Sequence, residues 1–203
     1  VRRTGSATSA ITSTPSGVTT VTDAANAADE ETDADTVSLR EGEQSICPVD
    51  AMEDPLRHLP PEAFDRLLVV STRGDPRRVE NAVRAADADP SKVLVVPVSG
   101  SAVRYDGPLR VSDRTPPSDM TGVGVRYTEA LRRFDGPAWV VVDNFNVFLM
   151  YADEKRVYRF MDSLTEKARE TGARGLYCTV RDAIADTTYE TFRNLFNSED
   201  DLR

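Results

Sequence analysis

The segment AWVVVD (138–143) joins an apolar run to a single carboxylate, Asp143. A carboxylate that follows a buried strand can hold a magnesium ion at the edge of a nucleotide pocket, because Mg²⁺ binds proteins through one or two carboxylates. Asp143 is therefore a candidate metal ligand. An aspartate in this position can instead accept hydrogen bonds from the following turn, and that interpretation requires no ligand. We favour the second interpretation, because other parts of a nucleotide site are missing from the sequence.

Other polar residues follow the remaining apolar runs. In open parallel sheets, ligands bind outside the carboxyl ends of the strands, so the residues just beyond each run are candidates for the rim of a pocket. These candidates are Asp50, Ser71, Thr72, Arg73, Ser99, Asn144, Asn146 and Arg181. Their types and spacing identify no catalytic residue and no cofactor ligand among them.

The sequence contains no phosphate-binding loop to accompany a magnesium site. Triphosphates on this kind of sheet are bound by G-x-x-x-x-G-K-[ST], in which backbone N–H groups and a lysine neutralise the phosphate charge. The three lysines are Lys92, Lys155 and Lys167, and none follows a glycine-rich turn. The segment after the first apolar run reads CPVDAMEDP (47–55) instead, and its Pro48 lacks an N–H donor.

The acids of this segment also oppose the binding of an anion. Asp50, Glu53 and Asp54 place up to three negative charges where a phosphate group would lie. Two like unit charges about 4 Å apart repel by about 4 kcal/mol at an effective dielectric constant of about 20. The segment holds no cationic side chain that could offset this repulsion. We therefore expect no ordinary ATP binding at this place.

The remaining residues that could do chemistry are interpreted as structural or solvated. His58 lies in a turn-rich connector without a Ser or Cys partner nearby in the sequence, so we expect a surface residue and no general base. Cys47 and Cys178 lack C-x-x-C spacing, which predicts two free, buried thiols. We expect solvated arginines paired with nearby acids, in preference to an anion site or a contact with a neighbouring subunit, at Arg73, Arg77, Arg78 and Arg181.

The charge of the chain limits its partners. It has 34 acidic and 25 basic residues among 203, a formal net charge of −9. Nucleic-acid backbones require clustered Lys and Arg, so this balance argues against nucleic-acid binding. The acidic, lysine-poor composition resembles that of proteins from salt-loving archaea. No apolar run approaches the roughly 18 residues that a membrane span needs. We expect a cytoplasmic protein that binds neither nucleic acid nor membrane.

The elements that must position these residues begin after an N-terminal tail. Residues 1–38 are rich in Thr, Ser, Ala and acids and contain no aromatic residue, which predicts a disordered segment ahead of one folded domain at 39–203. Apolar runs predict strands at 43–49, 66–72, 92–99, 138–143 and 175–180. Helical patterns separate most of these runs, with expected caps at Asp75, Ser118 and Asp153 and a capping box at Thr187 and Glu190.

Apolar strands that alternate with helices predict a three-layer α/β fold. The sheet is expected to be mostly parallel and five-stranded, with helices on both faces, because strands of such sheets are buried on both sides. The glycine-containing segment TGVGV (121–125) follows no strand. We interpret it as the start of a helix that packs closely against the sheet, and we assign it no phosphate.

The wording and order of several blocks resemble a known family. LLVVSTRGDPRRVENAV, DPSKVLVVPVSG, SDMTGVGVRYTEALRRF, WVVVDNFNVFLMYADEKRVYRFMDSLTEKARETGARGLYC and TFRNLF are similar to the RecA/KaiC-like ATPase superfamily, especially its haloarchaeal members. The resemblance covers residues 40–197. It implies a RecA-like core in which VVVD is the Walker B strand, lies beside the first strand, and presents Asp143 to the magnesium-bound water. The chain departs from the family because the Walker A loop and its lysine are absent.

These observations favour a RecA/KaiC-like domain that does not hydrolyse nucleotides. We expect it to bind no cofactor and to act in signalling or regulation through a protein partner or self-association. One alternative is a nucleotide-binding ATPase with an atypical phosphate loop, which would require Mg²⁺ and ATP. Another is a receiver-like switch in which Asp143 accepts the phosphate and Asp50, Glu53 or Asp54 supplies the other acid. The lysine that such switches place after the fifth strand is missing, because that run ends in Val180, Arg181 and Asp182.

Overall fold

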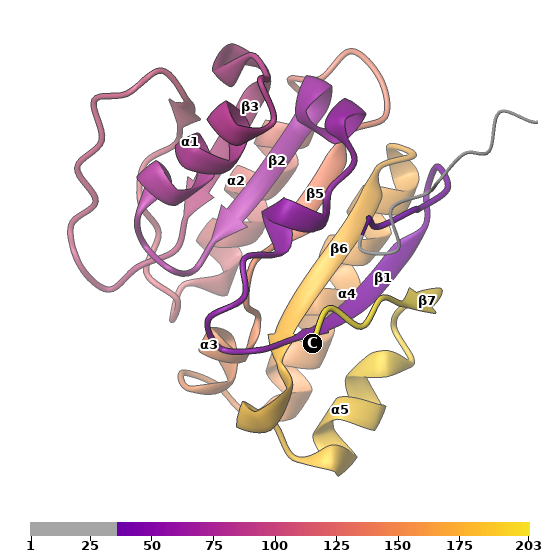
Figure 1. The fold of residues 1–203 in the computed structure, drawn as a ribbon. Helices are drawn as coiled ribbons and strands as arrows, with labels where there is room; N and C mark the ends of the chain where they lie inside the picture. The colour runs from indigo at the N-terminus through magenta and orange to yellow at the C-terminus, as the bar shows by residue number, and fades with distance from the viewer. Residues whose placement is uncertain (1–35) are drawn as a thin grey trace, which may run out of the picture. The chain divides into compact units, whose positions relative to one another are not determined.

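The five apolar runs form the centre of a parallel sheet (Figure 1). The computed structural model describes residues 36–203, and its central strands are β1 Gln44–Val49, β2 Leu67–Ser71, β3 Val93–Pro97, β5 Trp139–Val142 and β6 Arg174–Val180. Two further strands, β4 Arg110–Val111 and β7 Ser198–Glu199, extend the edges of the sheet. The order is β4-β3-β2-β5-β6-β1-β7, and every neighbouring pair is parallel.

The sheet has seven strands, so the predicted number of five is wrong. β4 interrupts a segment rich in Pro, Gly and Asp, and β7 lies near the end of the chain. Each has only two residues and therefore shows neither an apolar run nor an alternating pattern. They form because β3 and β1 would otherwise present unpaired backbone groups at the edges of the sheet.

The position of the strand that precedes Asp143 also differs from the expectation. β5 pairs with β2 on one side and with β6 on the other, so it does not lie beside β1. β1 pairs with β6 and β7 instead. A crossover connection can pass over several strands, and the sequence of the connection does not determine how many. The order of the strands therefore depends on tertiary contacts.

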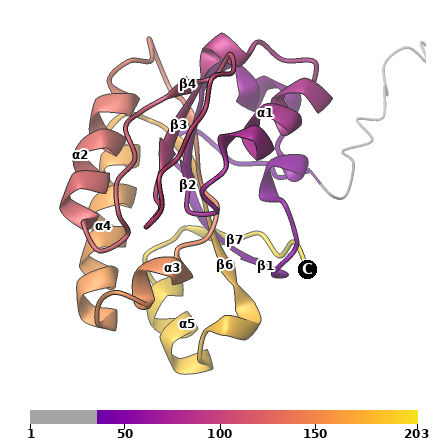
Figure 2. The same ribbon diagram turned by 90° about the vertical axis from the view of Figure 1, so that its left-hand side faces the viewer.

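Helices cover both faces of the sheet, as predicted. The helices are α1 Pro76–Ala85, α2 Met120–Leu131, α3 Asn146–Leu149, α4 Glu154–Glu170 and α5 Asp186–Arg193. Figure 2 shows α1 on one side of the sheet and α2 and α4 on the other. Two buried clusters result: one joins α1 to the sheet, and the other joins α2, α4 and α5 to its opposite face.

Short 3-10 helices connect several elements. They are η1 Pro55–His58, η2 Pro61–Arg66, η3 Pro90–Lys92 and η4 Arg181–Ala183. The connection from β1 to β2 consists of a turn at residues 50–54 followed by η1 and η2, which pack on the face that α1 covers. This connection contains no α-helix, which agrees with the short spacing between the first two apolar runs.

The predicted helix caps are correct for two of the helices. Asp75 and Asp153 accept hydrogen bonds from the N–H groups of Arg77 and Arg156, at 3.0 and 2.9 Å. α2 is capped by Asp119 and not by the predicted Ser118, because the Asp119 carboxylate accepts from the Gly122 N–H at 2.9 Å. The predicted capping box of Thr187 and Glu190 is wrong, because Thr187 lies inside α5, which begins at Asp186 after the N-cap residue Ala185 and has no side-chain cap.

The predicted N-terminal tail falls largely outside the described residues. At its end, Val37 is buried against the cluster under α1, and its N–H donates to the carbonyl of His58 at 2.8 Å. Cys47 and Cys178 are both buried and free, as predicted, and they face each other in register on β1 and β6.

A chain of buried polar groups, which was not predicted from the sequence, joins β1 to α2 and α4. The amide of Gln44 donates to the carbonyl of Ala173 at 2.7 Å and accepts from the Tyr177 hydroxyl at 3.0 Å. The Tyr177 and Tyr127 hydroxyls are 3.2 Å apart, and the Tyr127 hydroxyl donates to the carbonyl of Leu164 in α4. Buried polar groups of this kind are costly unless each has a partner.

Gly175 leaves the room that this chain occupies. A Cβ at Gly175 would overlap the side-chain oxygen of Gln44 and the ring of Tyr177. We expect Gly175→Ala to lower the free energy of unfolding by about 1–3 kcal/mol, as for other overpacked core sites. The matched control is Gly124→Ala in α2, where a Cβ would make an ordinary 3.8 Å contact with Phe160. That change should raise the same quantity by about 0.5–1 kcal/mol. Chemical denaturation measures both, and an equal effect of the two substitutions would contradict the packing argument.

Candidate functional site

The residues after β2 and β5 meet at the carboxyl end of the sheet because these two strands are neighbours. Asp143 is buried there, with 7% of its surface exposed. Its Oδ1 accepts hydrogen bonds from the backbone N–H and the hydroxyl of Thr72, both at 2.7 Å. Its Oδ2 accepts from the Ser71 hydroxyl at 3.2 Å. The carboxylate therefore ties the end of β5 to the turn after β2.

The electrostatics of Asp143 follow from this burial. Loss of solvent raises the pKa of the Asp143 carboxyl above its ordinary value. The hydrogen bonds from Thr72, the nearby guanidinium of Arg73 and the hydroxyl of Ser71 act in the opposite direction and favour the ionised form. Arg73 itself keeps one nitrogen, Nη2, that is buried and has no hydrogen-bond partner within residues 36–203.

The asparagines after β5 are bonded to the neighbouring strand. The Asn146 side-chain oxygen accepts from the Thr179 hydroxyl at 2.5 Å and from the Val180 N–H at 3.2 Å. Its amide nitrogen donates to the carbonyl of Val180 at 3.0 Å. The side-chain oxygen of Asn144 accepts from the Asn146 N–H at 3.0 Å. The Asn146 side chain thus joins the turn after β5 to the end of β6, and the Asn144 side chain holds the backbone of Asn146.

The structure brings only part of the predicted rim together. Ser71, Thr72, Arg73, Asn144 and Asn146 gather around Asp143. Asp50 follows β1, which is separated from β5 by β6, and within residues 36–203 no hydrogen bond joins it to Asp143. Ser99 caps its own turn by accepting from the Ser101 N–H at 3.1 Å. Arg181 turns toward α5, where it pairs with Asp186 and stacks on Tyr189, 4.5 Å from the ring centroid.

The acids after β1 have partners, which corrects one step of the sequence argument. Arg78 of α1 lies 3.4 Å from the Asp54 carboxylate. His58 lies 3.0 Å from Glu53, and this hydrogen bond lowers the pKa of the Glu53 carboxyl. The cationic partner of Asp54 comes from a helix more than twenty residues further along, so the segment alone could not reveal it. The His58 side chain is only 18% exposed and is not the surface residue that was expected.

The turn after β1 offers little to a phosphate group. In phosphate-binding loops the N–H groups of a helix N-terminus point at the anion. Here the chain enters the 3-10 helix η1, and the Asp54 carboxylate already accepts from the Leu56 N–H at 3.3 Å. The Glu53 N–H donates to the carbonyl of Asp50 at 3.1 Å. This part of the chain therefore uses its own carboxylate where a phosphate oxygen would be needed.

The same end of the sheet presents apolar side chains to solvent. Met52, after β1, is 90% exposed. Met150 and Tyr151, at the end of α3 after β5, are 79% and 52% exposed. Sequence reasoning missed these three residues because it searched the strand ends for polar groups only. Thr179, which bonds Asn146 from inside β6, was missed because hydroxyls occur throughout such strands.

Metal clusters and membrane-spanning helices are both absent from the part of the chain that the structure describes. Within residues 36–203, no group of three or more His, Cys, Asp or Glu side chains is placed to hold a metal ion. No helix in this range has the length and apolar character needed to cross a membrane.

Comparison with known proteins adds information on family and fold. Residues 48–198 match the model of a family described as a family of unknown function, DUF7504. No functionally curated protein matches the sequence. A solved structure of a protein from Pyrococcus horikoshii OT3 is similar with a TM-score of 0.52 and 12% identity, over 81% of this chain and 84% of that one. At this identity the likeness concerns the fold alone.

The raised pKa of Asp143 predicts a pH-dependent stability. Its folded-state pKa exceeds the unfolded value of about 3.9, so the folded state binds the proton more tightly. This contribution to stability is complete below about pH 3.9 and is lost as the pH rises through the folded-state pKa. Asp143→Asn has no such proton to lose. Its melting temperature relative to the wild type should therefore increase as the pH rises from about 3.9 toward neutrality. Thermal melts across this range measure the difference, and a difference that stays constant would contradict the assignment.

Proposed function

This chain belongs to the DUF7504 family, whose function is unknown, and we propose that it is a non-hydrolysing RecA/KaiC-like domain that acts through protein contacts in signalling or regulation. The observation that carries the proposal is the state of the carboxyl end of the sheet. The carboxylates of Asp143, Glu53 and Asp54 there are bonded to other groups of the chain. Three exposed apolar side chains lie at the same end; they are Met52, Met150 and Tyr151.

The first support is the geometry of Asp143. A magnesium site needs a carboxylate oxygen that is free to accept the ion or its bound water. Both oxygens of Asp143 accept hydrogen bonds from Ser71 or Thr72, and the carboxylate is buried. Binding of Mg²⁺ would require these bonds to break. A carboxylate that joins β5 to β2 explains the same residue without a metal.

The second support is the turn after β1. A triphosphate needs cationic side chains and free N–H donors in this place. The turn holds Asp50, Glu53 and Asp54. Arg78 pairs with Asp54, and His58 is hydrogen-bonded to Glu53. A phosphate group would have to compete with Asp54 for Arg78, so the carboxylates of this turn oppose an anion even though two of them have partners.

The third support is the exposure of Met52, Met150 and Tyr151. Methionine is flexible and polarisable and is common on surfaces that bind other proteins. Tyrosine offers a large apolar body with a polar tip, and it is enriched at interfaces. Burial of such exposed apolar side chains against a partner is favourable, and exposed apolar patches therefore mark interaction sites. We therefore place the protein-contact surface at the residues that follow β1 and α3.

One observation favours a second candidate, an atypical nucleotide-binding site. The guanidinium of Arg73 lies near Asp143 and has one buried nitrogen without a partner within residues 36–203. A phosphate oxygen could accept from it. The receiver-like alternative has less support, because the groups that contact the Asp143 carboxylate are two hydroxyls and one backbone N–H, where a receiver needs a second acid.

A titration with nucleotide separates the two candidates. We expect no saturable heat in calorimetry and no shift in melting temperature when ATP and Mg²⁺ are added to the full chain in concentrated salt. The reason is the competition from carboxylates and the lack of free donors after β1. A saturable shift that Asp143→Ala or Arg73→Ala abolishes would establish nucleotide binding and overturn the proposal. Equal melting temperatures of these variants without ligand, or a measured correction for any difference, serve as the control.

A cross-linking experiment tests the contact surface itself. A photoreactive phenylalanine analogue is placed at Met150 in one variant and at Met52 in another, with Ala85 at the end of α1 as the exposed control position. We expect a discrete protein adduct, with a partner or with a second copy of the chain, from the two methionine positions and not from Ala85. Adducts of equal yield from all three positions, or none from the methionine positions, would contradict the assignment.

A further inference from the structure

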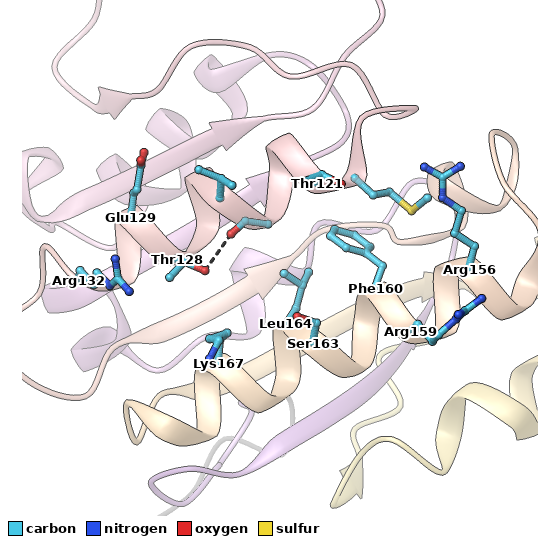
Figure 3. Close-up of a pocket in the computed structure, with 13 residues that line it drawn as sticks. Thr121, Thr128, Glu129, Arg132, Arg156, Arg159, Phe160, Ser163, Leu164 and Lys167 are labelled. Atoms are coloured by element: carbon cyan, nitrogen blue, oxygen red, sulfur yellow. Dashed lines mark hydrogen bonds between the residues drawn. The ribbon is translucent and has the colours of Figure 1, made fainter.

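The helices α2 and α4 lie on the face of the sheet opposite α1 (Figure 2), and a groove runs along their outer side (Figure 3). It encloses about 570 Å³ and is lined by residues of these two helices and by Arg132, which directly follows α2. None of the residues that follow β1, β2 and β5 lines this groove. A ligand of the groove is therefore independent of the function proposed for the carboxyl end of the sheet.

The floor of the groove is apolar and shallow on the α2 side. The residues on the α2 side are spaced at three and four positions, so they lie on one face of the helix, and several are small. They are Met120, Thr121, Gly124, Val125, Thr128, Glu129 and, directly after the helix, Arg132. Gly124 has no side chain, and Val125 is 52% exposed. From α4, Phe160 and Leu164 point into the same space (Figure 3). Another backbone could approach closely above Gly124.

The rim of the groove is basic, although the chain as a whole carries a net charge of −9. Four cationic side chains line it, against the single carboxylate of Glu129; they are Arg132, Arg156, Arg159 and Lys167. Within residues 36–203, no ion pair joins any of the three arginines to an acid, whereas Lys167 pairs with Glu170 at 2.7 Å. Figure 3 shows Arg132 and Lys167 toward one end of the groove and Arg156 and Arg159 toward the other.

The side of α4 that lines the groove is basic. Arg156, Arg159 and Lys167 line the groove and none of the acids of the helix does, whereas Lys155 and Arg169 lie elsewhere on the helix. Opposite charges on one face stabilise a solvated helix, so solvation alone does not favour a basic face. A strip of positive charge therefore lies beside an apolar floor on a protein whose net charge is −9. This combination matches a ligand that is apolar in the middle and acidic along its sides.

We propose that the groove binds an amphipathic helix with acidic flanks, contributed by a partner protein. α2 has 12 residues and so is about 18 Å long, which accommodates about three turns of a helix laid alongside it. Such helices dock through apolar residues at positions i, i+3 or i+4, and i+7. The apolar residues of the partner helix would cover Val125 and Phe160, because Leu164 is already buried beneath them. The absence of a side chain at Gly124 would let the partner backbone approach. Acidic residues on both sides of the partner helix would then meet the arginines at the two ends of the groove.

The same features argue against a nucleic acid as the occupant. A duplex would bring a high density of negative charge close to a protein whose net charge is −9, and its binding depends on many cations in an array. The groove offers four cations around an apolar floor. An apolar floor contributes most when carbon-rich side chains cover it. A helix with both apolar and acidic side chains uses both parts of the surface.

Fluorescence anisotropy with a synthetic probe tests the proposal. The probe is a fluorescein-labelled helical peptide of about 16 residues with Leu at every third or fourth position and Glu on both flanks. We expect saturable binding to the full chain, weakened as KCl increases because exposed charges are screened. The variant Arg156→Glu/Arg159→Glu should bind the probe at least about tenfold more weakly. Lys155→Glu is the matched control, because it reverses a charge on the same helix outside the groove, and it should bind within about twofold of the wild type.

A second pair of variants tests the floor without changing charge. Gly124→Leu places a large side chain in the groove and should block the probe. Gly124→Ala adds only a Cβ at 3.8 Å from Phe160 and should leave binding within about twofold of the wild type. Melting temperatures identify any variant that fails to fold, and the two pairs do not share a substitution. Loss of binding in one pair with its control intact supports the proposal even if the other variant is unstable.

Several results would overturn the inference. One is equal binding of a peptide in which every Glu is replaced by Lys. Another is competition by inorganic phosphate at the concentration of the probe, which would identify a simple anion site. A third is a concentration-dependent dimer in sedimentation that Arg156→Glu/Arg159→Glu abolishes, because the groove would then be occupied by a second copy of this chain. Absence of binding to the wild type in both low and high salt would also contradict it.

Discussion

An all-parallel sheet must be covered on both faces, because its strands are joined by crossovers and their side chains are apolar on both sides. In this protein α1 and the two 3-10 helices after β1 cover one face, and α2, α4 and α5 cover the other. The carboxyl end of the sheet and the outer sides of the helices remain available for contact with other molecules. The residues that follow β1, β2 and β5 lie at the first surface, and the groove along α2 and α4 lies at the second.

At the carboxyl end, burial determines what Asp143 can do. A carboxylate removed from water is stable only when hydrogen bonds satisfy it, and Thr72 and Ser71 provide them. The same bonds that stabilise the ionised group use the oxygens that a metal would need. The loop after β1 has the same character, since Asp54 caps its own 3-10 helix and pairs with Arg78. In both places the carboxylates are bonded to other groups of the described chain, and a small-molecule ligand would have to break these bonds.

On the outer side of the helices, the relation is reversed. The groove between α2 and α4 keeps three arginines that have no acidic partner within residues 36–203, and it exposes Val125. Unpaired charge and uncovered apolar surface can both be stabilised by a ligand of complementary character. The polar chain of Gln44, Tyr177 and Tyr127 underneath fixes α2 and α4 on the sheet. These hydrogen bonds hold the two helices that form the groove in place, which favours a preformed docking surface.

The sequence by itself determined the fold class, the five central strands and the caps Asp75 and Asp153, because periodicity and capping are local properties of neighbouring residues. It also placed Asp143, Ser71 and Thr72 at strand ends. Only the tertiary structure decided that β5 lies between β2 and β6, that Thr72 bonds Asp143, and that Arg78 reaches Asp54. The two edge strands and the groove likewise depend on contacts between distant segments. Such contacts are set by the paths of the crossovers and by how side chains pack, and no short stretch of sequence states either of these.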